Sequence, residues 1–378
     1  MTGDSYYGRM VTMKLKIIDF IKSFPETWKE RLQNAPYSLT IKESGEYVLF
    51  TYSQIGSDFS IPLVQECRGL ILNRHGWRPV CVPFFKFFNV QEQNAVDIDW
   101  GNARVLEKLD GSIIKLWFDN GWRVSTNGTI DARDASLSAP VSTMGYYKRI
   151  ENYHDLFMYA LVDINVEKML SRLDTTMTYM FELVSPYNRV VVPYTETKLF
   201  HIGTRSNEDL LEWEYYIPEI DKPEVYDISS LEECLDSAEK LPFSEEGYVV
   251  VDHNYNRVKI KSAEYVIAHH LRNNGAVTRR RIVDMILANG QDDFLSIYPE
   301  YQESFDEVES AIWEYVAKLM KESTDVPDCD TRKEFAQWAL TTTNAGYFFG
   351  VMDGKWNDPK EWLWGLSNDK ILEYIGLE

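Results

Sequence analysis

The sequence predicts an α+β protein in which an antiparallel sheet domain is followed by an all-helical domain. Up to residue 265, runs rich in β-branched and aromatic residues alternate with turn signals such as Asp119-Asn120-Gly121. After Tyr265, apolar residues recur at helical spacing and few strand signals remain. Because 378 residues are enough for two domains, we place them at residues 1–265 and 266–378.

The predicted elements follow from periodicity and composition. Strands are expected at residues 47–52, 69–72, 112–118, 178–184 and 248–252. Sheets of this kind need helices packed against them, and residues 10–31 read as one amphipathic helix. In the second domain, helical spacing predicts helices at residues 263–272, 304–322, 331–340 and 358–374.

Composition limits the class of protein. The four cysteines form no C-x-x-C pair, so the sequence indicates neither a zinc site nor a disulfide framework. No signal-peptide pattern and no run of about 18 apolar residues is seen, so a cytoplasmic protein without a membrane partner is expected. The formal net charge of −20 argues against a broad nucleic-acid surface, but it does not exclude local positive charge in a cleft.

Lys108 opens the run Lys108-Leu109-Asp110-Gly111. A lysine in this setting can attack a nucleotide α-phosphate and hold AMP, provided that it first loses its proton. The run alone is weak, because a surface lysine before an Asp-Gly turn is common. Burial or neighbouring cations would favour the neutral amine.

Two further lysines are candidates for that neighbourhood. Lys259 and Lys261 flank one residue, so a strand places both on the same face. Such a pair can neutralise a triphosphate and stabilise a leaving pyrophosphate. Taken alone, the pair is more typical of a solvated strand face.

The N-terminal half supplies two more cations in unusual settings. Arg68-Gly69 begins an apolar strand, and Lys86 lies within the aromatic run from Phe84 to Phe88. A purely structural core would not select Lys86. Phe84, Phe85 and Phe87 are interpreted as core, whereas Phe88 is either core or a stacking surface for a base.

Two glutamates accompany apolar strands. Glu182 lies within an apolar run and needs a partner if buried, either a ribose hydroxyl, a hydrated Mg²⁺ or the structural cation Arg189. Glu246 begins a strand at Glu246-Gly247 and can hold a metal-bound water or orient Lys108. The alternative for Glu246 is a solvated turn acid, as its neighbour Glu245 suggests.

Together, the ordered segments resemble the covalent nucleotidyltransferases, which include nucleic-acid ligases and capping enzymes. The segments are Lys108-x-Asp110-Gly111, Phe181-Glu182, Glu246-Gly247 and Lys259-x-Lys261. Arg68-Gly69, Lys86-Phe87-Phe88-Asn89, residues 181–191 and Lys259–Ser262 with Tyr265 narrow the resemblance to the bacteriophage RNA ligase 1 family, over roughly residues 40–270.

This resemblance implies an antiparallel-sheet nucleotidyltransferase (ATP-grasp-like ligase) domain and a three-step reaction using ATP and Mg²⁺ or Mn²⁺. ATP adenylates Lys108, AMP passes to an RNA 5′-phosphate, and a 3′-hydroxyl then attacks. The implied catalytic residues are Lys108, Lys259, Lys261, Glu246 and Arg68. The implied nucleotide contacts add Glu107, Lys86, Phe88, Gly111, Asn127 and Glu182, with Glu182 and Glu246 also serving the metal, either directly or through water.

The sequence departs from the family at one point, because Asn127 occupies the place where the family often has a lysine before the glycine. An amide donates hydrogen bonds but brings no charge. In the family, the C-terminal domain selects RNA, notably broken tRNA anticodon loops, and a partner kinase-phosphatase heals the ends. Here the basic residues Arg272, Arg279, Arg280 and Arg281 can receive RNA phosphates or form a solvated helix start.

The leading interpretation is therefore an ATP-dependent, phage-encoded ligase of single-stranded RNA or nicked tRNA, acting in RNA repair. A DNA ligase or GTP-using capping enzyme is an alternative on the same chemistry, but these usually carry an OB-fold after the Lys-x-Lys segment. A non-catalytic RNA-binding relative is a further alternative, although such a protein is expected to have lost Lys108 or a partner.

Overall fold

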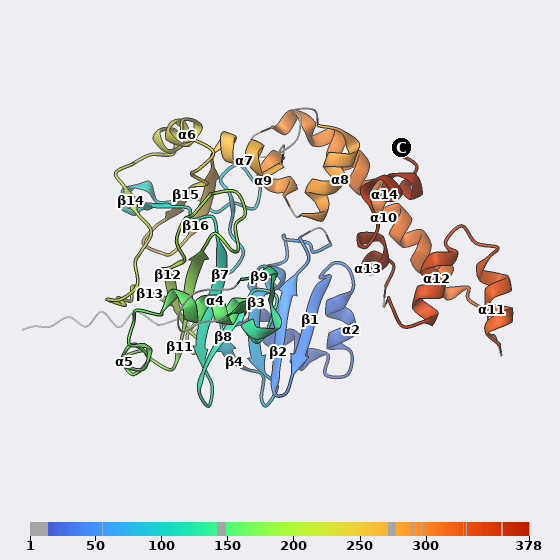
Figure 1. Ribbon diagram of the computed structural model, residues 1–378, viewed down its shortest axis with the longest axis horizontal. Coiled ribbons are helices and arrows are strands. Elements are labelled where there is room, and N and C mark those ends of the chain that lie inside the picture. The colour runs from blue at the N-terminus through green and yellow to red at the C-terminus, as the bar shows by residue number, and fades with distance from the viewer. Residues whose placement is uncertain are drawn as a thin grey trace, which may run out of the picture. The chain divides into compact units, whose positions relative to one another are not determined.

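The computed structural model describes residues 14–54, 56–141, 149–270, 277–288, 290–295, 298–327, 329, 331–356 and 358–377 (Figure 1). The chain divides into two compact units, Met1–His269 and His270–Glu378. The first unit contains helices and sheets, whereas the described elements of the second are all helices. The expected α+β fold with a helical C-terminal region is confirmed.

The first sheet has the order β1-β2-β3-β4 and is antiparallel throughout. Its strands are Leu39–Ser44, Tyr47–Tyr52, Arg68–Asn73 and Arg78–Cys81. Helices α1 (Lys16–Ser23), α2 (Trp28–Gln33) and α3 (Pro62–Glu66) share one apolar core with it, in which Ile17, Leu32 and Leu63 lie with Phe50 and Leu70. The strands expected at residues 47–52 and 69–72 are confirmed.

The single helix expected at residues 10–31 is wrong. Within the described residues of that segment, α1 ends at Ser23 and α2 begins at Trp28. Pro25 lies in the break, where its ring restricts the preceding residue and removes a backbone donor. The amphipathic spacing continued across the break, so periodicity alone did not reveal it.

Glu66, the last residue of α3, ties that helix to α1 and makes the stability of the fold depend on pH. Its buried carboxylate accepts hydrogen bonds from the backbone N–H groups of Lys16 at 3.0 Å and Ile17 at 3.2 Å. Burial nevertheless raises the pKa of Glu66 from 4.5 to about 7. Because the folded state binds the proton more tightly, this contribution is full below pH 4.5 and is lost as pH rises through 7.

We therefore expect Glu66→Gln to flatten the pH dependence of the free energy of unfolding. Between pH 4.5 and 8, the wild type should lose about 3 kcal/mol more than the variant, as urea denaturation at both pH values would measure. Glu26→Gln is the matched control, because Glu26 is exposed. Equal pH slopes in the wild type and the Glu66 variant would contradict the assignment.

The second sheet has the order β13-β12-β11-β7-β8, again antiparallel. Its strands are Glu212–Trp213, Lys198–Ser206, Met177–Val184, Ser112–Phe118 and Trp122–Thr126. The ribbon of β9 (Ser136–Val141) and β10 (Ile150–Asn152) leads into α4 (Tyr153–Ala160), and α5 (Val166–Leu170) follows. Leu156 and Phe157 of α4 join the core of this sheet, so the helix covers one of its faces.

The third sheet has the order β14-β6-β15-β16-β5. Its strands are Val225–Tyr226, Arg104–Glu107, Gly247–Val251, Arg257–Lys261 and Phe88–Asn89, and the β16–β5 pair is parallel. Helix α6 (Leu231–Glu239) packs Cys234 and Ala238 against Val250 and Val258. Helix α7 (Ala263–His270) follows β16 directly.

The second unit contains α8 to α14 (Figure 1). They are Arg279–Leu287, Gln291–Leu295, Gln302–Thr324, Arg332–Ala339, Ala345–Met352, Pro359–Trp364 and Asn368–Ile375. The helices expected at residues 304–322 and 331–340 are confirmed, as α10 and α11. The helix expected at residues 358–374 is instead α13 and α14, interrupted from Gly365 to Ser367.

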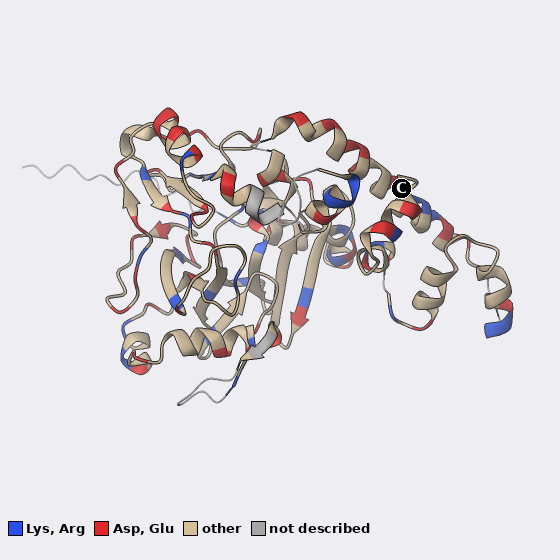
Figure 2. Cartoon of the chain, turned by 45° about the horizontal axis from the view of Figure 1, so that its top comes forward, with Lys and Arg blue, Asp and Glu red and all other residues tan. Residues whose placement is uncertain are grey.

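Charge and hydropathy agree with the composition. Asp and Glu residues are spread over elements of both units rather than gathered on one (Figure 2). Among the described residues, none of the helices combines the length and apolar character that crossing a bilayer requires.

Candidate nucleotidyl-transfer site

Lys108 stands where the chain passes from the third sheet to the second. It follows β6 directly, and residues 108–111 lead into β7. Its backbone N–H donates to the carbonyl oxygen of Gly247, at 2.9 Å, and so extends the pairing of β6 with β15 by one residue. The side chain is thereby held at the end of two paired strands.

Lys108 and Lys261 share one carboxylate oxygen. The Lys108 Nζ lies 2.7 Å from Glu246 Oε1, and the Lys261 Nζ lies 2.8 Å from the same atom. Register explains the meeting, because Gly247 pairs with Lys261 across β15 and β16 and Glu246 precedes Gly247. The three side chains are 20%, 10% and 5% exposed in the order Lys108, Lys261 and Glu246, so solvent screens these charges weakly.

The pKa values of the two glutamates of the site shift in opposite directions. Burial opposes ionisation of Glu246, but Lys108 and Lys261 outweigh it and hold its pKa below the usual value. Glu182, on β11, has its pKa raised to about 8 by burial, with the Glu246 carboxylate adding to the rise and Lys108 and Arg68 opposing it. Glu182, Glu246 and Lys108 therefore lie close enough to interact electrostatically.

Asp110 fixes the loop that carries Lys108. Its buried carboxylate accepts hydrogen bonds from the N–H groups of Val191 and Val192, at 2.8 and 2.7 Å. Its second oxygen accepts from the Tyr265 hydroxyl, at 2.8 Å. With three donors, Asp110 connects the loop to the segment after β11 and to α7, which is a positioning role.

Gly111 is required by close packing. A Cβ at this position would lie 2.4 Å from the carbonyl oxygen of Leu183 on β11. Even alanine would therefore push the nucleophile loop away from the second sheet. Asp110 and Gly111 thus both fix the loop that carries Lys108.

Arg68 and Asn127 each have a buried polar atom without a hydrogen-bond partner. These atoms are Arg68 Nη1 and Asn127 Oδ1. The Arg68 guanidinium lies 4.9 Å from the centre of the Phe87 ring, and it is near enough to Glu182 to affect its pKa. Unsatisfied buried polar atoms are costly. A polar ligand bound near Glu182 could satisfy them.

Lys115 was missed by sequence reasoning. This fully buried lysine of β7 donates from Nζ to the carbonyl oxygen of Gly69, at 2.5 Å. Burial lowers its pKa to about 8, and nearby Arg68 acts in the same direction. Gly69 has φ +83°, and a Cβ there would lie 2.5 Å from Lys115 Nζ and 2.8 Å from Asn127 Cα. Lys115 therefore places a cationic group beside the Asn127 backbone; the only sequence signal was a charged residue inside an apolar strand.

Residues 66–265 match the family model described as RNA ligase. This span contains every segment brought together above. The chain belongs to the bacteriophage RNA ligase 1 family. The match covers Glu66 to Tyr265, and Tyr265 is the residue that anchors Asp110.

Individual proteins agree with this family. The chain is 32% identical over 289 residues to a putative bifunctional polynucleotide kinase/RNA ligase of Autographa californica nuclear polyhedrosis virus, covering 70% of the chain and 39% of that longer protein. It is 26% identical over 418 residues to an RNA ligase of Rhodothermus phage RM378, covering 89% and 92%. A solved archaeal ATP-dependent RNA ligase aligns at 12% identity and TM-score 0.44, covering 78% and 83%.

Three other expected contacts of this RNA ligase family member are Lys86, Phe88 and Lys259. Lys86 is buried with its Nζ 3.9 Å from the Phe59 ring centre and 5.2 Å from that of Phe88. Phe88 is 4% exposed, so its ring is mostly covered by these neighbours. Lys259 lies on the same face of β16 as Lys261, because the alternating residues Val258 and Ile260 are buried on the opposite face.

Glu107 and Arg189 have other surroundings. Burial raises the pKa of Glu107, and its charged neighbours are Glu224 and Glu245 rather than the Glu246 cluster. Arg189 donates from Nε to the carbonyl oxygen of Val191, at 2.9 Å. Within the described part of the chain, the structural ion pair considered for Glu182 and Arg189 does not form.

The basic residues of the second unit are partly neutralised. Arg279 pairs with Glu307 at 2.7 Å and Arg280 with Asp369 at 3.1 Å. Arg281 has a buried Nη1 without a hydrogen-bond partner. Thr278 precedes α8 but makes no side-chain cap, and Arg272 lies outside the described residues.

No group of three or more His, Cys, Asp or Glu side chains in the described ranges could hold a metal ion by itself. A divalent metal at this site would therefore need oxygen ligands from elsewhere, such as phosphates and water, besides Glu182 and Glu246. Such sharing is usual for Mg²⁺.

Proposed function

We propose that the protein is an ATP-dependent RNA ligase that joins a 5′-phosphate to a 3′-hydroxyl through a covalent lysyl-AMP. The observation that carries this proposal is the sharing of Glu246 Oε1 by Lys108 and Lys261 at 2.7 and 2.8 Å. It supplies a nucleophile, a second cation for phosphates and a fixed carboxylate in one place. Membership of the RNA ligase family supports the substrate class.

In the first step, Lys108 Nζ attacks the α-phosphorus of ATP. The N–P bond forms, the bond from the α-phosphorus to the bridging oxygen breaks, pyrophosphate leaves and Nζ releases its proton. Lys261, paired to the same carboxylate oxygen, disfavours positive charge on Lys108 and can pass to the pyrophosphate oxygens. Glu246 has a lowered pKa, so it orients the two lysines better than it accepts the proton.

The remaining steps transfer and release AMP. An oxygen of the RNA 5′-phosphate attacks the lysyl-AMP phosphorus, the N–P bond breaks and Lys108 takes up a proton. A 3′-hydroxyl then loses its proton and attacks the 5′-phosphate, so that the new phosphodiester forms and AMP leaves. Both steps place negative charge near Lys259 and Lys261, which share a face of β16.

The residues present fit a nucleotide. Arg68 Nη1 is an unpaired buried donor and Asn127 Oδ1 an unpaired buried acceptor, which a phosphate and a base or ribose group can satisfy. Glu182 would hold a divalent metal or a ribose hydroxyl, and Glu246 would hold the metal through water. The metal would neutralise phosphate charge.

The setting of the reaction is proposed from the same family. The second unit would select RNA. Arg279, Arg280 and Arg281 would contact its phosphates. The viral relative named as a bifunctional polynucleotide kinase/RNA ligase suggests a kinase-phosphatase partner that prepares the ends. We propose repair of single-stranded RNA or nicked tRNA in the cytoplasm of a phage host.

The test is intact-protein mass after incubation with ATP and Mg²⁺, with GTP in parallel, followed by addition of 5′-phosphorylated RNA. A gain of about 330 Da with ATP only, discharged when RNA is sealed, is the expected result. Labelling by GTP would instead favour capping-type chemistry, and sealing of DNA ends alone would favour a DNA ligase. Protein found without AMP before and after incubation would contradict covalent catalysis.

A further inference from the structure

A cavity lies at the Arg257 end of β16, which is the end opposite Lys261. It has a volume of about 570 Å³, which falls within the usual range for a small-molecule site. Its walls combine rings and cations, including Phe84, Phe85, Arg205, Trp213, Tyr255 and Arg257. All are described residues of the first unit. Lys86 and Phe88, which the sequence analysis expects as nucleotide contacts, also line the cavity.

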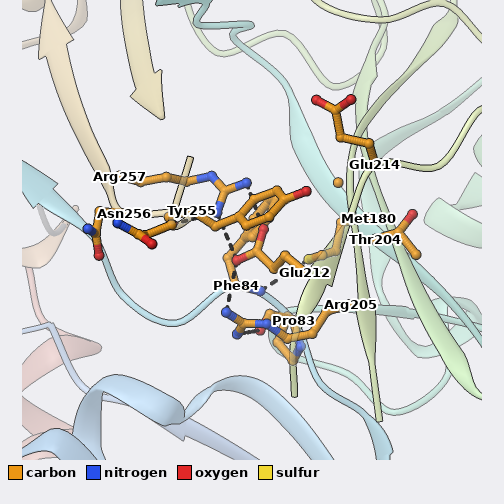
Figure 3. A network of polar contacts seen from close by, with 12 residues as sticks. Pro83, Phe84, Met180, Thr204, Arg205, Glu212, Glu214, Tyr255, Asn256 and Arg257 are labelled. Atoms are coloured by element: carbon orange, nitrogen blue, oxygen red, sulfur yellow. Dashed lines mark hydrogen bonds and ion pairs between the residues drawn. The ribbon is translucent and has the colours of Figure 1, made fainter. Parts of the chain in front are cut away.

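A buried ion network forms the floor of this cavity (Figure 3). Arg205 and Arg257 each donate to Glu212 Oε1 at 2.8 Å, and Arg257 also reaches Oε2 at 2.7 Å. Each guanidinium is 4.2 Å from the centre of a phenylalanine ring, Phe85 for Arg205 and Phe84 for Arg257. One carboxylate thus offsets two guanidinium charges, and the floor retains positive charge.

The described lining is cationic in an acidic protein. Lys86, Arg205 and Arg257 are lysine or arginine, whereas Glu212 is the one carboxylate among the described lining residues. The chain as a whole has a formal charge of −20. Arg205 is 8% exposed, and its Nε has no hydrogen-bond partner. A cationic cavity in an acidic protein favours an anionic ligand.

The rim supplies apolar surface for a flat group. Trp213 is 48% exposed, and Val96 and Leu211 beside the same cavity are 40% and 36% exposed. Exposed apolar residues gathered around one hollow mark a binding surface more often than isolated ones do. Rings above a cationic floor match a nucleotide, whose base stacks and whose phosphate accepts hydrogen bonds.

Strand β16 runs from the cavity to the Lys108 site. Arg257, Lys259 and Lys261 alternate along one face of β16, opposite the buried Val258 and Ile260. Lys261 lies four residue steps along the strand from Arg257, a distance of about 13 Å. A few nucleotides of a strand span such a distance, so a cationic row connects the cavity to the cluster at Glu246.

We propose that this cavity binds a nucleotide of the RNA strand, a few positions from the end being sealed. Trp213 stacks on the base, and the Arg205–Glu212–Arg257 floor receives the phosphate or base edge. The proposal rests on the ligase function above for the identity of the strand. It adds an RNA contact in the first unit to the contacts proposed for the arginines of the second.

The test measures the affinity of a fluorescein-labelled, 5′-phosphorylated 12-nucleotide RNA by anisotropy. We expect Trp213→Ala to weaken binding about 5- to 150-fold, the range for loss of one base stack, and Trp213→Tyr to restore most of it. Tyr216→Ala is the matched control, because Tyr216 is 70% exposed but does not line the cavity. Self-adenylation, which needs no RNA, reports whether each variant keeps an intact Lys108 site.

A second readout locates the strand directly. RNA carrying 5-iodouridine is expected to crosslink to a peptide containing Trp213 or Tyr255. Unchanged affinity in Trp213→Ala with crosslinks only to the second unit would overturn the proposal. Wild-type protein that binds RNA through Trp213 but never forms the AMP adduct would refute the ligase function while leaving the cavity assigned.

Discussion

Lys108→Ala is expected to abolish covalent labelling by AMP. This variant lacks the amine proposed to form the N–P bond, which lies between β6 and β7. Loss of the nucleophile should lower the labelling rate by at least about 10³-fold. Intact-protein mass after incubation with ATP measures this directly.

The variant should remain folded, which makes its loss of labelling interpretable. Lys261 stays 2.8 Å from Glu246 Oε1, so the buried carboxylate keeps a cation when Lys108 is removed. Lys198→Ala is the matched control, because Lys198 is 51% exposed and its ion-pair partner Glu196 is 68% exposed. An AMP adduct that persists in folded Lys108→Ala protein would show that another residue is the nucleophile.

Glu212→Ala is expected to destabilise the first unit by about 3–5 kcal/mol. Glu212 lies on β13 of the second sheet, whereas Arg257 lies on β16 of the third, so the pair joins two sheets. Removing the carboxylate leaves Arg205 and Arg257 buried without their counter-ion. Urea unfolding followed by circular dichroism measures the change in the free energy of unfolding.

Its control uses a neighbouring glutamate on the surface. Glu214 pairs with Arg104, but the two side chains are 62% and 44% exposed, so Glu214→Ala should cost less than about 1 kcal/mol. Equal effects of the two substitutions would mean that the Arg205–Glu212–Arg257 network contributes no more than a surface pair. Glu212→Gln, which keeps the shape but removes the charge, should fall between them.

Most strands were predictable because their side chains alternate and turn residues bound them. The segments 47–52 and 112–118 match β2 and β7 in full. Helix ends were harder, because the breaks at Pro25 and at Gly365 fall inside segments whose apolar spacing continues. The domain boundary was expected after residue 265. The two compact units separate after His269, within the same helix α7.

The site was predictable where residues adjoin in sequence and not where pairing brings them together. Lys259 and Lys261 follow from alternation along one strand. The meeting of Lys108, Glu246 and Lys261 depends on the register of β6, β15 and β16, which no local pattern encodes. Lys115 was overlooked because its burial and its bond to Gly69 arise from packing between the first and second sheets.

The hydrogen bond from Tyr265 to Asp110 sets where the catalytic part of the chain can be shortened. The Lys-x-Lys segment ends at Lys261, and a boundary drawn there would remove the hydroxyl that satisfies Asp110 Oδ1. The buried carboxylate would then keep only its two backbone donors, from Val191 and Val192. A shortened protein that still forms the lysyl-AMP must therefore retain the first turn of α7, although none of the proposed catalytic residues lies on that helix.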